Sequence, residues 1–330
     1  MTLNVRYGWT TKVIGDSCYI DWVRKGSDAE KQGLKRGDRL VSWDRMETSR
    51  RSIRILNYVY YALSPREYVK LVVETPDKSL RELTIKAEVK RGQNVLDYST
   101  LEARAQLSAQ AEEAIRTNIH STYSFGDSVM VWRFPSFQYG DRYLGEMFAR
   151  ARRHRSLILD LRGNGGGALV TQLDVVSNLF DREVVVGTLI ERGNATAYVA
   201  KPVGQPFLGR LVLLLDSESA SSSEILARTA QLEYRATLVG DRTAGAVVAS
   251  LFYAHRIGHT KGVDYALQVS VADFVMSDGK RLEGVGVTPQ EIVLPTPQDL
   301  LEERDPVLAH ALALDGVQID PKAAAKLFRR

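Results

Sequence analysis

The segment at residues 216–227, DSESASSSEILA, directly follows the apolar run LVLLL at 211–215 and places five serines within seven positions. A short apolar run, then small polar residues, then apolar residues at helical spacing predict a strand that ends where a helix begins. Hydroxyls at such a junction either cap the free N–H groups of the helix or expose a nucleophile beside them. The rest of the sequence has to distinguish these two interpretations.

The same strand-then-helix pattern repeats through the second half of the chain. Strands are predicted near 128–134, 156–161, 211–215 and 236–240, and helices at 140–154, 168–180 and 222–233. This alternation predicts an α/β fold with largely parallel strands. Residues 5–92 instead have the pattern of short strands around one helix. We therefore predict four parts: a domain at 5–92, a connector and helix at 93–118, an α/β core at 119–298 and a helical tail at 299–330.

The composition excludes several classes of protein. The 330 residues are 44% apolar and 25% charged, with a net charge of +4, which is ordinary for a soluble globular protein. The sequence has no basic stripe with interleaved aromatic residues, so no nucleic-acid partner is expected. No apolar run reaches the ~18 residues of a membrane span, so no such span is expected either. The first 30 residues lack the pattern of a signal peptide, so the chain as written is predicted to be soluble. One cysteine and five scattered histidines have no metal-ligand spacing, so neither metal nor organic cofactor is expected.

Two glycine-bounded turns and a strand make up GSDAEKQGLKRGDRLVSWD at 26–44. This segment resembles the bacterial PDZ pattern and implies an N-terminal PDZ domain at 5–92. A PDZ domain captures an extended peptide by adding it as a strand to the edge of a sheet. By that resemblance the strand CYIDWV supplies the edge, with Tyr19, Ile20 and Trp22 as peptide-binding residues, and the helix around 53–61 forms the opposite wall. A PDZ fold that serves only as a rigid spacer is the alternative.

A glycine-rich loop, SLILDLRGNGGGALV at 156–170, has three interpretations. Gly163, Gly165 and Ala168 fit the dinucleotide-binding fingerprint, which would make the chain a nicotinamide-dependent oxidoreductase. The acidic residue expected about 20 residues further on, at the end of a second strand, has no clear counterpart. The loop could instead expose backbone N–H groups to a developing oxyanion, or form only a tight turn.

Four blocks follow one another in the second half of the chain: DLRGNGGG at 160–167, SASSSEI at 219–225, GDRTAG at 240–245 and DGKRLEGVGVTP at 278–289. Together they resemble the C-terminal processing (tail-specific) peptidases, whose distant relatives include the tricorn core protease. The resemblance implies a ClpP/crotonase-like α/β protease core that follows the PDZ domain. It also implies a serine endopeptidase whose substrates are unfolded or C-terminally exposed polypeptides, tethered by the PDZ domain.

The resemblance assigns roles to single residues. The nucleophile falls on Ser221, and the oxyanion would be bound by the backbone N–H of Ser222 together with that of Gly165 or Gly166. Ser219 and Ser223 are predicted to cap the helix instead, and capping is also the alternative for Ser221.

The general base is the point where this sequence departs from the family pattern. Most members carry a lysine after the Gly-x-x-Thr-x-Gly block, where this chain has Ala246. The tricorn-like branch uses a histidine upstream of the PDZ domain together with a glutamate, which falls on Glu283 here; a surface turn charge is the alternative. His255, His259 and His120 are the candidate bases within the chain, and an ordinary structural role is the alternative for each. A missing N-terminal segment would explain the absent upstream histidine, and the family resemblance then implies a periplasmic or extracellular location.

Two further interpretations stay open beside the peptidase. A catalytically impaired homologue could act as a peptide-binding protein, because the lysine and the upstream histidine are both absent. A crotonase-type acyl-CoA enzyme would share the core fold, but SASSSE has no role in it. For the leading interpretation the expected partners are polypeptide substrates, bound through their C-terminal ends, and a second copy in a homo-oligomer.

Overall fold

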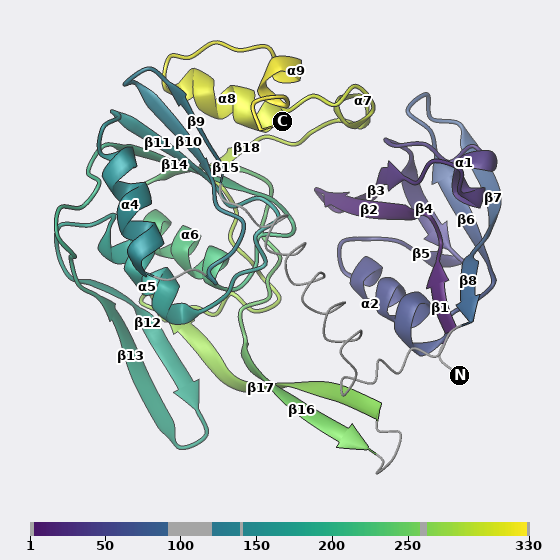
Figure 1. The fold of residues 1–330 in the computed structure, drawn as a ribbon, viewed down its shortest axis with the longest axis horizontal. Helices are drawn as coiled ribbons and strands as arrows, with labels where there is room; N and C mark the ends of the chain where they lie inside the picture. Colours follow the sequence, from purple (N-terminus) through teal and green to yellow (C-terminus); the bar gives the residue numbers. More distant parts are fainter. Residues whose placement is uncertain (1–2, 92–120, 139–140, 258–262, 329–330) are drawn as a thin grey trace, which may run out of the picture. The chain divides into compact units, whose positions relative to one another are not determined.

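The computed structural model describes residues 3–91, 121–138, 141–257 and 263–328 (Figure 1). They belong to two compact units. The first comprises residues 1–96, 294–306 and 321–325, and the second comprises 97–293, 307–320 and 326–330. Within the described segments, each helix is too short or too polar to cross a membrane.

The first unit is built mainly of short antiparallel strands. One sheet has the order β2-β3-β4-β6-β7, with β5 paired to β4, and β1 pairs separately with β8. The strands are β1 (Leu3–Arg6), β2 (Trp9–Ile14), β3 (Ser17–Val23), β4 (Arg39–Trp43), β5 (Met46–Glu47), β6 (Tyr68–Glu74), β7 (Leu80–Lys86) and β8 (Glu88–Arg91). The helices are α1 (Asp28–Lys31), α2 (Ser52–Tyr58), its π-helical continuation η1 (Val59–Leu63), α7 (Pro297–Leu301) and α9 (Pro321–Ala324).

Both ends of the helical segment 52–63 are fixed beside β2. At one end, the Tyr60 ring stacks on Trp43 with centroids 4.5 Å apart, and Trp43 in turn lies 4.7 Å from Trp9 of β2. At the other end, Arg50 donates from Nε to the carbonyl of Gly15, just after β2, over 2.8 Å. These two contacts set the direction of the helical segment antiparallel to that of β2.

The second unit contains a largely parallel six-stranded sheet of order β18-β15-β14-β11-β10-β9. Only the β9–β10 pair is antiparallel. The strands are β9 (Ser121–Phe125), β10 (Val129–Arg133), β11 (Ser156–Asp160), β14 (Arg210–Leu215), β15 (Thr237–Gly240) and β18 (Glu291–Ile292). Between them lie the helices α4 (Asp141–Ala151), α5 (Leu169–Ser177) and α6 (Ser222–Leu232). The predicted α/β fold with largely parallel strands is confirmed.

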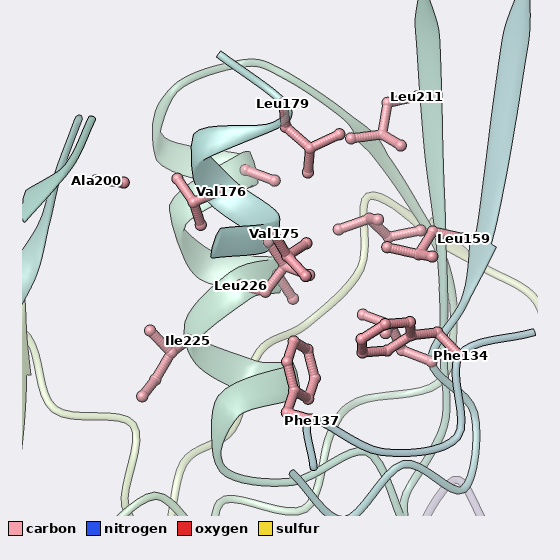
Figure 2. Packing of buried hydrophobic residues seen from close by; sticks show 14 of the residues in the cluster. Phe134, Phe137, Leu159, Val175, Val176, Leu179, Ala200, Leu211, Ile225 and Leu226 are labelled. Carbon is pink, nitrogen blue, oxygen red and sulfur yellow. The ribbon is translucent and has the colours of Figure 1, made fainter. Parts of the chain in front are cut away.

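Both faces of this sheet are covered, as parallel sheets require. On one face, Val175 of α5 and Leu226 of α6 pack toward Leu159 of β11 in a single core (Figure 2). Side chains that alternate with these along the strands, such as Ile158 and Val212, are also fully buried. α8 (Pro306–Leu314) carries a buried apolar face and is tied to the sheet at its end, where Arg210 donates to the Leu314 carbonyl over 2.6 Å.

A second sheet of the same unit is antiparallel and was not predicted from the sequence. Its order is β13-β12-β17-β16, from β12 (Val184–Glu191), β13 (Asn194–Ala200), β16 (Ala249–Ile257) and β17 (Val263–Met276). β16 and the paired part of β17 extend from the unit as a two-stranded ribbon (Figure 1).

Candidate active site

The four sequence blocks meet at one edge of the parallel sheet. The carboxyl ends of parallel strands lie on the same side of a sheet, so the loops after β11, β14 and β15 are neighbours. Ala220 donates its N–H to the carbonyl of Asn164 over 2.9 Å, and Ala244 donates to Ser219 over 2.9 Å. The fourth block joins them because Gly284 donates its N–H to the carbonyl of Gly245 over 2.9 Å. Backbone hydrogen bonds therefore hold all four blocks together.

Ser221 lies at the N-terminus of α6 in an unusual backbone conformation. It is the N-cap residue, with φ +55° and ψ −118°; its hydroxyl makes no cap hydrogen bond, and its backbone N–H donates to the Glu224 carboxylate over 3.0 Å. A positive φ is strained for a residue other than glycine and is found preferentially at functional turns. The side chain is half-buried, and the Ser221 N–H donates to the carbonyl of Ala246 over 2.9 Å. Among the described residues the Ser221 hydroxyl is therefore not held by a cap hydrogen bond, and it stands at a strand-to-helix turn.

The neighbouring serines attach the helix start to the strand ends and the glycine loop. The hydroxyls of Ser219, Ser222 and Ser223 donate to the carbonyls of Leu161, Gly167 and Asn164, respectively, each over 2.9 Å. The prediction that Ser219 and Ser223 cap α6 is therefore wrong, because both hydroxyls bond outside the helix. Three of the five hydroxyls in the segment have this fixing role.

The glycine loop packs directly against Ser221. A Cβ atom on Gly166, whose φ is +99°, would lie 2.6 Å from the Cβ of Ser221, so only glycine fits there. The Gly166 N–H donates to Oδ1 of the buried Asn164 over 2.8 Å, and Asn164 donates from Nδ2 to the Phe134 carbonyl over 2.7 Å. The Gly166 N–H is thus already used, which favours Gly165 among the two predicted oxyanion donors.

Two backbone N–H groups near Ser221 stay available. Within the segments that the structure describes, the N–H groups of Gly165 and Ser222 have no hydrogen-bond partner. Ser222 is the first residue of α6, whose initial N–H groups have no partner inside the helix. Such groups at a helix N-terminus attract a developing negative charge.

Glu224 connects α6 to the loop after β15, and its importance was missed in the sequence. Its buried carboxylate accepts four hydrogen bonds: from the Thr243 hydroxyl (2.5 Å) and from the N–H groups of Gly245 (2.7 Å), Ala246 (2.9 Å) and Ser221 (3.0 Å). Burial raises the pKa of Glu224 above its ordinary value, and these hydrogen bonds oppose that rise. A glutamate three residues after a serine at a helix start is the capping-box signal that could have identified it.

Glu283 binds the backbone that follows Ala246. Its Oε2 atom accepts from the N–H groups of Val247 (2.6 Å) and Val248 (3.0 Å). The residue is solvent-exposed, and its Oε1 atom has no hydrogen-bond partner among the described residues. Glu283 is therefore joined to Ser221 through the loop 246–248 and has one carboxylate oxygen left for a further donor.

The three candidate histidines are not brought to this site by the described part of the chain. His255 lies exposed on β16, six residues beyond Ala249. At about 3.3 Å per residue this places it about 20 Å along the ribbon from the loop 246–248. His120 and His259 lie outside the described residues.

The predicted peptide-binding strand is not an edge. β3 pairs with β2 on one side and with β4 on the other, and the Ile20 N–H donates to the Asp38 carbonyl over 2.8 Å. Ile20 is fully buried, Tyr19 is half-buried, and Trp22 is exposed opposite Thr10 of β2. The prediction that CYIDWV supplies the edge is wrong; β2 is the terminal strand of this sheet.

No cluster of three or more His, Cys, Asp or Glu side chains with a geometry suited to a metal ion occurs in the segments described.

Comparison with known proteins identifies the family. The model for peptidase family S41 matches residues 129–293, which is half of the chain. The carboxyl-terminal-processing protease of Picosynechococcus sp. is 36% identical over 138 residues, covering 41% of this chain and 31% of that protein. The tail-specific protease of Haemophilus influenzae is 30% identical over 127 residues, covering 36% of this chain and 18% of that protein. The match thus spans about a third or less of these relatives.

A solved structure agrees at the level of the fold. Mature CPAF has a TM-score of 0.63 at 14% identity, covering 96% of this chain and 84% of that protein. At this identity the likeness concerns the fold alone. Together with the matched family model, these findings show that the chain belongs to peptidase family S41, the family of the C-terminal processing peptidases.

Proposed function

We propose that this chain is a serine endopeptidase that cleaves polypeptides through an acyl-enzyme at Ser221. The observation that carries the proposal is the strained N-cap conformation of Ser221. Beside it lie the N–H groups of Gly165 and Ser222, which have no partner in the described segments. In this mechanism Ser221 Oγ attacks the scissile carbonyl while its proton passes to a general base. The two N–H groups stabilise the resulting oxyanion.

The second half of the reaction returns the proton. The base protonates the leaving amine, which departs and leaves an ester on Ser221; water then hydrolyses the ester and restores the serine. With Ala246 in the lysine position, we propose His120 or His259 as the base. The Oε1 atom of Glu283, which has no partner among the described residues, is an acceptor available to orient a base.

Labelling with a fluorophosphonate, read by intact mass and peptide mapping, tests the nucleophile. We expect one adduct on Ser221, absent from Ser221→Ala and retained in the matched Ser223→Ala variant, whose hydroxyl bonds to Asn164 instead. His120→Gln and His259→Gln, made separately, identify the base by the loss of labelling. A well-folded parent chain that takes up no fluorophosphonate would contradict the proposal.

We further propose that the first unit is a PDZ domain on a ClpP/crotonase-like core, and that it tethers substrate along β2 rather than β3. β2 is the terminal strand, the helical segment runs antiparallel to it, and this helix exposes Ile55 and Tyr58. A peptide with a free C-terminal carboxylate should therefore bind more tightly than its amidated form, measured by calorimetry on Ser221→Ala. Equal affinities would contradict C-terminal capture. Homo-oligomerisation and export, both implied by the resemblance, stay predictions.

A second candidate function is peptide binding without hydrolysis. The observation that favours it is Ala246 in the position of the family's lysine, since a serine hydroxyl is a weak nucleophile without a nearby base. Under this alternative the parent chain binds peptide, shows no hydrolysis and takes up no fluorophosphonate. Peptide binding would then be unchanged in Ser221→Ala.

A further inference from the structure

A basic hollow of about 500 Å³ lies in the first unit, and it includes no residue of β2 or α2. It is lined by residues of β1, the segment after β3, α1 and the junction of β7 with β8. Five basic side chains contribute to it: Arg6, Arg24, Lys25, Lys31 and Lys86. The hollow is therefore separate from the strip between β2 and the helix.

Two of these cations are already compensated. Arg24 forms an ion pair with Glu88 over 2.6 Å. Lys86 has Glu67 at 3.5 Å, and its Nζ lies 5.4 Å from the ring centroid of Tyr68. The remaining acid in the lining, Asp28, accepts a hydrogen bond from the backbone N–H of Lys86 over 2.7 Å.

The other three cations have no such compensation. Arg6, Lys25 and Lys31 are exposed and form no ion pair within the part of the chain that the structure describes. The lining holds five basic against two acidic side chains, a formal charge of +3, and Glu67 beside Lys86 reduces the local excess to two positive charges. Grouped charges of one sign with few counter-charges raise the local concentration of anions and speed their association.

The frame that carries these cations is fixed by hydrogen bonds. The Arg24 N–H donates to the Gly8 carbonyl over 2.8 Å, and the buried Ser27 hydroxyl donates to the Arg24 carbonyl over 2.6 Å. The Gly26 N–H donates to the Glu30 carboxylate over 2.6 Å. A frame that is already ordered reduces the entropy lost when a ligand binds.

We propose that this hollow binds an acidic polypeptide segment, a short run of Asp and Glu side chains. The three free cations come from β1, a loop and α1, and two of them are lysines, which act as separate point charges. A phosphate site would instead bring backbone N–H groups and an arginine fork together on one group. Separate charges on three elements suit a ligand with several single carboxylates, and the volume is within the range of ligand sites.

The test uses the full-length Ser221→Ala chain, so that the probe is not cleaved. Fluorescein-labelled hexaglutamate is titrated and binding is read by fluorescence anisotropy, with hexaglutamine as the uncharged comparison. We expect hexaglutamate to bind and hexaglutamine not to bind. The triple variant Arg6→Gln, Lys25→Gln, Lys31→Gln should weaken binding about tenfold, since each exposed ion pair contributes modestly.

A matched triple variant separates this hollow from general surface charge. Lys35→Gln, Arg45→Gln and Lys70→Gln remove the same charge from exposed positions of the same unit outside the hollow, and should change the affinity less than about twofold. An equal loss in both triples, or no binding of hexaglutamate, would overturn the proposal. Inorganic phosphate that binds the hollow when hexaglutamate does not would overturn the choice of ligand. No hydrolysis is measured, so failure here leaves the proposed peptidase activity untouched.

Discussion

At the scale of the residue, Glu224 fixes the backbone of the proposed nucleophile. Each of its two carboxylate oxygens accepts two hydrogen bonds, so all four bonds need an acceptor at this side chain. Glu224→Gln turns one oxygen into an NH₂ group that faces two donors. We expect the free energy of unfolding to fall by about 1–3 kcal/mol and the fluorophosphonate labelling of Ser221 to slow.

Urea unfolding and labelling rates measure these two effects. Glu233→Gln, at the end of the same helix, is the matched control because its partner is the exposed Arg182. The control should change the free energy of unfolding by less than about 1 kcal/mol. Equal stability of the parent and Glu224→Gln proteins would show that the carboxylate does not hold this loop.

The glycine loop offers a second test at this scale. Gly166→Ala would bring a methyl group to 2.6 Å from the Ser221 Cβ, at a φ of +99° that disfavours alanine. A Cβ atom on Gly165 would meet no atom within 4 Å, and Gly165→Ala keeps the backbone N–H. We expect Gly166→Ala to lower the rate of Ser221 labelling more than tenfold, which is a rise of about 1.4 kcal/mol or more in the activation free energy.

Gly165→Ala should label at close to the parent rate. Thermal unfolding of both variants shows whether the loop alone is affected. Labelling that is equally fast in both would mean that Gly166 does not need to approach the nucleophile so closely.

At the scale of the element, the interior position of β3 affects its cysteine. Cys18 is fully buried between paired strands, and burial raises the pKa of its thiol to about 11. In the unfolded chain the thiol ionises near its ordinary value of about 9. Because the folded chain holds the thiol proton more tightly than the unfolded chain, the protonated thiol contributes to the free energy of unfolding. That contribution is complete below pH 9 and is lost as the pH rises toward 11.

We expect this loss to be at most about 2–3 kcal/mol, for a shift of two pKa units. The free energy of unfolding, measured in urea at pH 8 and at pH 10.5, should fall more in the parent chain than in Cys18→Ala. Equal falls would show that the buried thiol is not what is titrating. The native protein should also resist thiol reagents at pH 8 and react once unfolded.

The position of β3 also shows what local sequence can and cannot predict. Alternating burial of Cys18 and Ile20 is encoded locally, so the strand itself was predicted correctly. Whether a strand has one neighbour or two depends on pairing with distant segments, and the assignment of CYIDWV as an edge came only from the PDZ resemblance. α6 was predicted within one residue because its apolar spacing and its serine start are both local signals.

The site was predictable to the extent that it follows the ends of strands. Ser221 and the glycine loop stand directly after apolar runs, so their meeting follows from the parallel order of β11 and β14. The engagement of the Gly166 N–H by Asn164 could not be read from the sequence, because it depends on a side-chain rotamer. Three of the four hydrogen bonds to Glu224 depend likewise on how a loop about 20 residues away folds back.

At the scale of the whole molecule, the proposed chemistry and the proposed tether lie in different units. The matched family region, 129–293, falls within the second unit, and the exposed helix face with Ile55 falls within the first. A fluorophosphonate reacts with the nucleophile without needing a tether, whereas a long polypeptide would use both units. The two activities can therefore be separated by mutation.

Ile55→Glu puts a charge on the proposed peptide face without removing a buried contact, since Ile55 is 65% exposed. We expect the KM for an unfolded polypeptide to rise about tenfold, because binding that is equal in ground and transition states affects KM alone. The labelling rate of Ser221 and the kcat should stay unchanged. Arg54→Gln, at the exposed neighbour on α2, also lowers the net charge by one and is the matched control for charge. A parallel loss of labelling and hydrolysis would mean that the helix acts on the active site itself, and an unchanged KM would mean that β2 and its helix bind no substrate.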